Sequence, residues 1–127
     1  MAASPIPETA QRADWPRLVA RRANDLEKRL SAAERVAVRS VTASGAIVSS
    51  DVIVVVDATA GAVSIALPAA AISRGRVLYI KKIDATANTV TLDPIGAETI
   101  DGAATKATAV QYYSFTIVCD GSGWWIV

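Results

Sequence analysis

Apolar and polar residues alternate in short runs through the second half of the chain, and Gly, Pro, Asn or Asp interrupts these runs at near-regular intervals. Alternation with a period of two is typical of β-strands that bury one face. Interruptions such as Asp93-Pro94 and Asp101-Gly102 are typical of turns. We therefore expect about eight short strands in residues 47–127, folded as an antiparallel β-sandwich or barrel-like domain.

The first expected strand ends in a continuous apolar run, Val52 to Val56. A continuous run indicates burial on both faces of a strand. In an antiparallel domain, one face would contact the core and the other a neighbouring chain. We therefore predict that Val54 and Val56 contribute to an oligomer interface.

A helix is expected over residues 16–38, a stretch rich in Leu, Ala, Arg, Glu and Lys without an internal Gly or Pro. Its apolar residues recur at alternating spacings of four and three and form a narrow stripe, with charged residues outside it. The stripe consists of Val19, Ala23, Leu26, Leu30, Ala33 and Ala37. Such a helix either packs on its own β-domain or forms a short parallel coiled coil with other copies. The narrow stripe favours the coiled coil, with Val19, Ala23, Leu26, Leu30 and Ala33 as interface residues.

Two segments flank this helix. Residues 1–15 carry Pro5 and Pro7 among small and polar residues and cannot bury a core, so we expect an extended peptide that either docks onto a partner or has no role. Residues 39–46 lose the helical spacing and gain Ser, Thr and Gly, which predicts a linker.

Composition limits the partners that this chain can have. Its 127 residues, with 13 basic and 12 acidic side chains, give a net charge of +1, which supports neither nucleic-acid binding nor an anionic membrane surface. The apolar fraction of 52% is high for a small domain and favours a homo-oligomer. We expect a protein made in a cytosol without membrane insertion, with its single Cys119 buried as a small hydrophobe.

Residue types that carry catalysis are scarce. The chain has no histidine, which excludes the commonest general base and metal ligand. Four aspartates, Asp84, Asp93, Asp101 and Asp120, stand at turn positions, where their carboxylates accept hydrogen bonds from backbone amides. Lys81 and Lys82 are expected to be strand residues with solvated ammonium groups. We therefore predict no catalytic, cofactor or metal site and no enzymatic activity; a hydrolase that uses scattered carboxylates is the least favoured alternative.

Trp124 and Trp125 are adjacent in the last expected strand, so their side chains point to opposite faces. One of them belongs to the core. The other lies at a subunit interface, forms a platform for a sugar ring, or is simply exposed, and interfaces are enriched in aromatic residues. Both remain candidates for a ligand surface.

The order of these elements resembles a recurring β-module of tailed-bacteriophage virion fibres, such as short tail fibres and head or neck fibres. The matching positions are Leu67-Pro68, Gly75, Lys81-Lys82, Asn88 to Leu92, Gly96, Glu98 to Gly102, and Asp120-Gly121 before Trp124-Trp125. The resemblance covers roughly residues 50 to 127. Trp15-Pro16 and Asn24-Asp25-Leu26 also look like N-terminal segments with which phage fibres dock onto the particle. The resemblance implies a homotrimer with a helical stalk and intertwined β-domains, which attaches through Pro5, Ile6, Pro7, Trp15 and Pro16.

We therefore expect a non-enzymatic structural component of a virion, a short trimeric fibre that is made in the host cytoplasm. Its partners would be further copies of itself and a capsid, portal or tail protein. The chain is far shorter than most host-binding tail fibres, which favours a short fibre, a decoration of the head or neck, or a base for another protein. The alternative is a module that binds a host receptor or a surface glycan.

Overall fold

The computed structural model describes residues 20–21, 23–24 and 35–127. The chain forms two units, Met1–Val36 and Ala37–Val127, and we call the second the β unit. The expected docking peptide of residues 1–15 and most of the expected helix of residues 16–38 lie outside the described residues.

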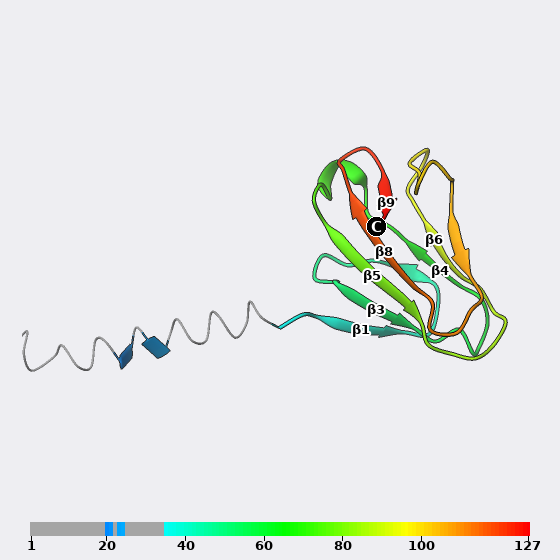
Figure 1. The fold of residues 1–127 in the computed structure, drawn as a ribbon, viewed down its shortest axis with the longest axis horizontal. Helices are drawn as coiled ribbons and strands as arrows, with labels where there is room; N and C mark the ends of the chain where they lie inside the picture. Colours follow the sequence, from blue (N-terminus) through cyan, green and yellow to red (C-terminus); the bar gives the residue numbers. More distant parts are fainter. Residues whose placement is uncertain (1–19, 22, 25–34) are drawn as a thin grey trace, which may run out of the picture. The chain divides into compact units, whose positions relative to one another are not determined.

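The β unit consists of two sheets that face each other (Figure 1). Sheet A is five-stranded, in the order β1 (Val38–Val41), β3 (Ile53–Val56), β5 (Val77–Lys82), β8 (Ser114–Cys119) and β9 (Trp124–Ile126). Sheet B is four-stranded, in the order β2 (Gly45–Ala46), β4 (Val63–Ala66), β6 (Val90–Asp93) and β7 (Lys106–Thr108). A short 3-10 helix, η1 (Ala70–Ile72), precedes β5. The expectation of a mainly β fold is confirmed.

Consecutive strands alternate between the sheets from β1 to β6, so the chain winds as a short coil. The pairs β1–β3, β3–β5, β2–β4 and β4–β6 are therefore parallel. Only β7, β8 and β9 add to their sheets in the antiparallel sense. The expectation of a wholly antiparallel domain was wrong, because a turn of a few residues can lead either back along the same sheet or across to the opposite one.

Strands also occupy residues 39–46, where we expected a linker. Val38 begins β1 and pairs with Ile53 of β3, and residues 35–37 have no regular secondary structure, so the expectation of a helix was wrong for residues 35–38. The β-branched residues of β1 suit a pleated sheet, and Thr42 and Ser44, which suggested a linker, lie in the turn between β1 and β2, while Gly45 begins β2. The β unit consequently begins ten residues earlier than expected, at Ala37 rather than at Ile47.

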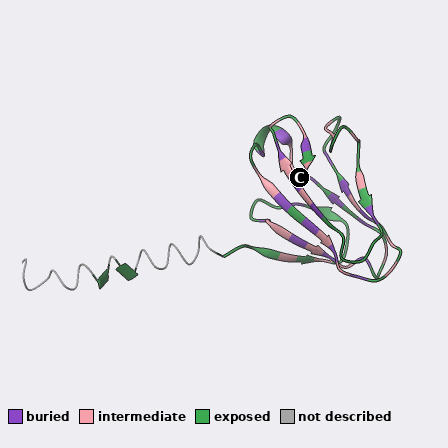
Figure 2. Cartoon of the chain, viewed as in Figure 1, coloured by how far each residue is buried: buried purple, intermediate pink, exposed green. Residues whose placement is uncertain are grey.

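The core lies between the two sheets, and alternate residues of each strand point into it (Figure 2). Its fully buried side chains include Val54 and Val56 of β3, Leu78 and Ile80 of β5, and Trp124 of β9. Cys119 is buried, as predicted. The core consists mostly of branched aliphatic side chains, which matches the period-two pattern read from the sequence.

The last strand is fixed from both sides. On one side β9 pairs with β8, and on the other Asp101 N–H donates to the carbonyl of Trp124 at 3.0 Å, while Ile126 N–H donates to the Asp101 carboxylate at 3.0 Å. Asp101 and Gly102 have φ angles of 50° and 78° and form the tight turn that the Asp-Gly pair predicted. This edge of sheet A is therefore covered, whereas among residues 35–127 no strand pairs with the other edge, which is formed by β1.

The two faces of β5 provide a test of this architecture. Ile80 points into the core and Lys81 points outward, so Ile80→Ala should lower the free energy of unfolding by about 2–5 kcal/mol. Lys81→Ala should lower it by less than about 1 kcal/mol. Urea unfolding followed by circular dichroism measures both. Equal losses would contradict the assignment of the two faces.

Candidate functional site

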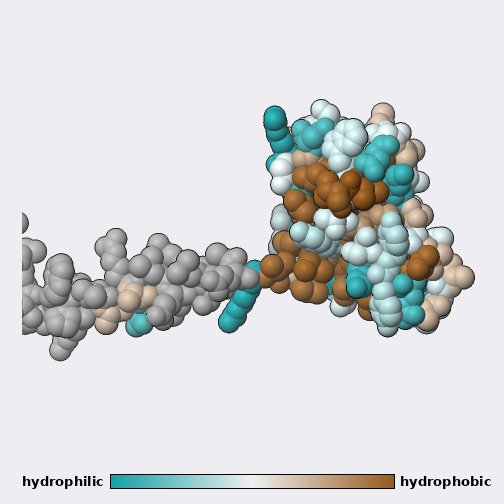
Figure 3. Space-filling view, viewed as in Figure 1, coloured by the Kyte–Doolittle hydropathy of each residue, from teal (hydrophilic) through white to brown (hydrophobic). Residues whose placement is uncertain are grey.

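The outer face of sheet A is apolar over most of its extent. Strand alternation and the burial of the neighbouring residues place one set of side chains on this face. Its apolar members are Val38, Ile53, Val55, Val77, Tyr79, Val118, Trp125 and Val127, and its polar members are Ser40, Lys81, Ser114 and Thr116. We call the apolar members the sheet A patch. Val38 is 63% exposed, Trp125 49% and Tyr79 40%. Figure 3 shows hydrophobic atoms gathered beside the start of β1 and over β5, β8 and β9.

The outer face of sheet B has a different composition. Its side chains are small or polar, namely Ala46, Ser64, Ala66, Thr91, Asp93 and Ala107. Both sheets contribute apolar inner residues to the core. The difference between the two outer faces is therefore not a consequence of folding the single chain, because a sandwich needs only its inner faces to be apolar. Exposed apolar patches of this kind mark sites of interaction.

This patch corrects the predicted interface residues of β3. We predicted Val54 and Val56, but both side chains are 0% exposed and belong to the core. Ile53 and Val55 are the members of the same run that reach the outer face. The run itself identified the strand with two apolar faces, but the sequence did not establish which residues belong to which face.

Trp125 is the aromatic residue of the pair that stays exposed, while Trp124 is buried. The indole N–H of Trp125 donates to the Asp120 carboxylate at 2.8 Å. The backbone amides of Ser122 and Gly123 donate to the other oxygen of that carboxylate, at 2.8 and 2.9 Å. The hydrogen bond from Trp125 and those from the two amides lower the pKa of Asp120 to about 2. The carboxylate is thus ionised at neutral pH and fixes the edge of the exposed ring.

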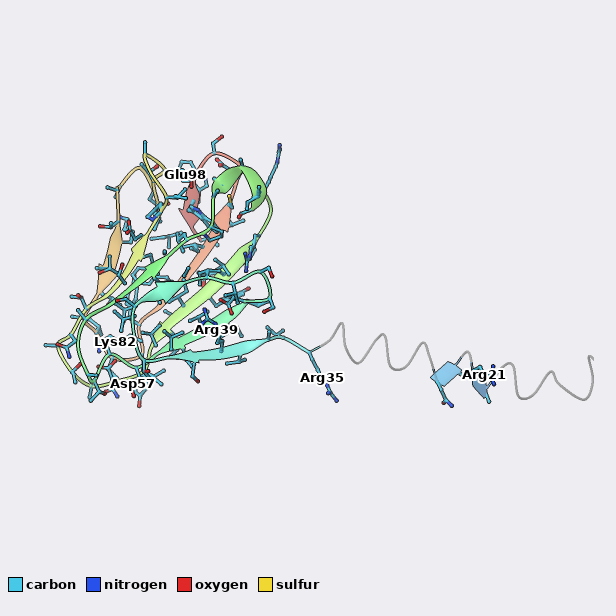
Figure 4. All side chains as sticks on the ribbon, turned by 180° about the vertical axis from the view of Figure 1, so that it is seen from behind. Arg21, Arg35, Arg39, Asp57, Lys82 and Glu98 are labelled. Atoms are coloured by element: carbon cyan, nitrogen blue, oxygen red, sulfur yellow. The ribbon has the colours of Figure 1, made fainter. Side chains whose placement is uncertain are left out.

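A second arrangement that the sequence did not reveal is a buried ion pair at one end of the β unit. Lys82 Nζ lies 2.5 Å from Asp84 Oδ2, and the two side chains are 0% and 3% exposed. Asp84 also accepts the Ala58 amide at 2.7 Å and the amide and hydroxyl of Thr86. Figure 4 shows Lys82 and Asp57 at this end and Glu98 at the other. The expectation that Lys82 keeps a solvated ammonium group was wrong, because its position in β5 points inward.

This pair joins loops that are distant in the sequence. Asp84 connects the segment after β3 to the segment after β5, and Asn88 Nδ2 adds a hydrogen bond to the Ala58 carbonyl at 2.8 Å. Burial raises the pKa of the Asp84 carboxyl, but the hydrogen bonds from Lys82, Thr86 and Ala58 outweigh it and hold the pKa well below its ordinary value of 3.8. The role of the pair is therefore structural.

Another ion pair holds β1 in place. Arg39 donates to both oxygens of Asp51, at 2.8 and 2.7 Å, and to the carbonyl of Ala46 at 3.1 Å. Asp51 also accepts the amide of Val48 at 2.8 Å. The bidentate geometry connects the edge strand of sheet A to the turn before β3. Because this arginine points inward, the outer side of β1 carries only Val38 and Ser40.

The other predicted site residues lie largely outside this region. Residues 5–7, 15–16, 19, 26, 30 and 33, which include the predicted docking residues and most of the predicted helical interface, lie outside the described residues. Ala23 is described and is exposed in the single chain. Within residues 20–21, 23–24 and 35–127, no group of three or more Cys, Asp or Glu is arranged to hold a metal ion. In the same part of the chain, no helix is long and apolar enough to cross a membrane.

Comparisons with known proteins provide no relative. No protein-family model matches the chain, and no curated protein matches it.

The Lys82–Asp84 pair yields a prediction for stability. Lys82→Met should lower the thermal unfolding midpoint by roughly 10 °C or more at pH 7, because it leaves a buried carboxylate without its cation. The folded-state pKa of Asp84 lies below that of the unfolded chain, so its contribution is complete above about pH 4 and is lost as the pH falls. The difference between wild type and variant should therefore shrink between pH 4 and pH 2. A difference that stays constant over this range, measured by scanning calorimetry, would contradict the assignment.

Proposed function

We propose that this chain is a non-enzymatic structural component of a phage virion, a short trimeric fibre that attaches through its N-terminal segment and projects its β unit. The observation that carries the proposal is the sheet A patch. The chain is 52% apolar, and the outer face of one sheet is also apolar. Such a face is typical of a subunit that buries its exposed apolar surface against other subunits.

The positions that carry the resemblance to phage fibres also support this proposal. Gly75, Gly102 and Gly121 have φ angles of 80°, 78° and 94°, which side chains other than glycine rarely adopt. Lys82 supplies the cation of the buried ion pair. A sequence pattern made of such positions specifies turns and loop contacts. The resemblance therefore reflects positions that determine a fold, and none of these positions identifies an active site.

A second candidate function, a module that binds a host receptor or glycan, is favoured by Trp125. Its ring is half exposed, and its edge is fixed by the hydrogen bond to Asp120. A fixed and exposed indole loses little conformational entropy when a sugar ring stacks on it. Binding of a glycan at this position would compete with subunit contacts on the same patch.

The structural role can be tested on particles. Phage produced by a strain that carries this gene should contain the chain after density-gradient purification, as measured by quantitative mass spectrometry. The amount should follow the major capsid protein across the gradient and should resist a wash at high salt. A chain that stays in the soluble fraction of the lysate and is absent from the particle band would contradict the proposal.

The second candidate is tested with the full chain on a glycan array. Specific binding that is lost in Trp125→Ala and kept in Ile72→Ala would favour the binding module, because Ile72 is an exposed apolar residue outside the patch. The fibre proposal predicts no specific binding in either case.

A further inference from the structure

The expected helical stripe lies a few residues before the sheet A patch in the sequence. Val38 begins β1 and belongs to the patch, and residues 35–37 before it have no regular secondary structure. Ala33 is the last residue of the expected stripe before them, so four residues, 34–37, separate the stripe from Val38. The distance from Ala33 to Val38 is therefore at most about 18 Å along an extended chain. The segment before β1 joins the β unit at the edge strand of sheet A.

This connection limits where other copies can lie. Helices of a coiled coil pack with their axes about 8–10 Å apart. If the stripe joins copies, their Val38 residues must lie near the common axis of the helices, because only four residues separate each from Ala33 of the stripe. The surface around Val38, on the outer side of β1 and β3, is then the part of each β unit nearest to the other copies.

The charge of the patch suits a second copy of the same chain. A homotypic contact brings identical surfaces close together, so a strongly charged face would repel itself. The strands of sheet A carry a single charged residue on the outer face, Lys81, whose ammonium lies 5.7 Å from the centre of the Tyr112 ring. One further charge, the Asp120 carboxylate, lies beside Trp125 at the other edge of the sheet and is hydrogen-bonded to its indole N–H. The open edge is also neutral on this side, because Arg39 is paired with Asp51.

The size of the patch indicates that it does not act alone. Five strands about 4.8 Å apart and rows of residues about 7 Å apart give an area on the order of 20 Å by 14 Å before the side chains are added. A stable interface buries roughly 800 Å² on each partner. Contacts between β units would therefore need the preceding segment to hold the copies together, and any test requires the full chain.

We propose that the sheet A patch, beginning at Val38, is the surface through which copies of this chain pack against one another around a common axis. This inference rests on the proposed trimeric fibre and adds the contacting face. Sheet B, with Ala66 and Asp93 on its outer side, faces away from the axis.

The first experiment compares two carboxylate substitutions in the full chain. Val38→Asp places a charge on the patch, and Ala66→Asp places the same charge on the outer face of sheet B, where the residue is also exposed. Sedimentation velocity over a range of concentrations should show self-association at least about tenfold weaker for Val38→Asp than for wild type, and unchanged for Ala66→Asp. Circular dichroism and thermal unfolding establish that both variants are folded.

The second experiment introduces a cysteine, so its result does not depend on whether the fold tolerates a new charge at position 38. Cys119 is buried, so a cysteine introduced on the surface is the reactive thiol among residues 35–127. Val38→Cys should form disulfide-linked pairs of chains under mild oxidation, and Ser64→Cys on sheet B should form few.

The outcomes separate the two proposals. Suppose that the wild-type chain is oligomeric, that Val38→Asp does not change this oligomeric mass, and that position 38 shows no preferential crosslinking. This result would overturn the inference but would not contradict the fibre proposal. A wild-type chain that stays at the 13.2 kDa mass of one subunit at the highest concentrations would overturn both the inference and the trimer. Loss of association in Val38→Asp together with crosslinking at position 38 supports the inference.

Discussion

From β1 to β6 the chain crosses between two sheets after every strand, and most features of the β unit follow from this winding. Each sheet grows by parallel addition, so every strand presents one face to the core and one to the outside. The inner faces are mostly aliphatic. Because the coil starts at β1 and β2, these two strands are edges, while the later strand β9 is covered by contacts with Asp101. The open side of the β unit is thus the side at which the preceding segment joins it.

Two ion pairs connect parts of the β unit that the hydrogen bonds of the sheets do not connect. Lys82 and Asp84 close one end by joining segments from different turns of the coil, and Arg39 and Asp51 tie the first strand to the turn before β3. Burying charges costs free energy unless each is paired and hydrogen-bonded, and Asp84 meets this condition through Lys82, Ala58 and Thr86. These residues have structural partners, which leaves the outer surfaces as the places where partners can bind.

Local pattern predicted the strands better than their arrangement. Alternation and turn residues predicted short strands through residues 47–127 and a last strand at Trp124 and Trp125, which is β9, and the Asp101-Gly102 turn followed from the conformational freedom of that pair. Parallel pairing was missed because it depends on where the chain goes after a turn, which residue types near the turn do not specify. The inward position of Lys82 was missed for a related reason: in an apolar strand, a lysine is normally expected to point outward, and its carboxylate partner lies in a turn. Val54 and Val56 were assigned to the outer face of β3 but belong to the core, because a shift of one position in a strand exchanges the two faces.

The account depends on the contrast between the outer faces of the two sheets. Sheet A exposes Val38, Tyr79 and Trp125, whereas sheet B exposes small and polar residues, and the preceding segment enters beside Val38. A crystal structure of the full chain in its assembled state tests this most directly. The account predicts that Val38 and Tyr79 lie within about 4.5 Å of another copy around a three-fold axis, with the outer face of sheet B in solvent. An assembly in which the outer face of sheet A is left in solvent, while sheet B forms the contacts, would contradict it.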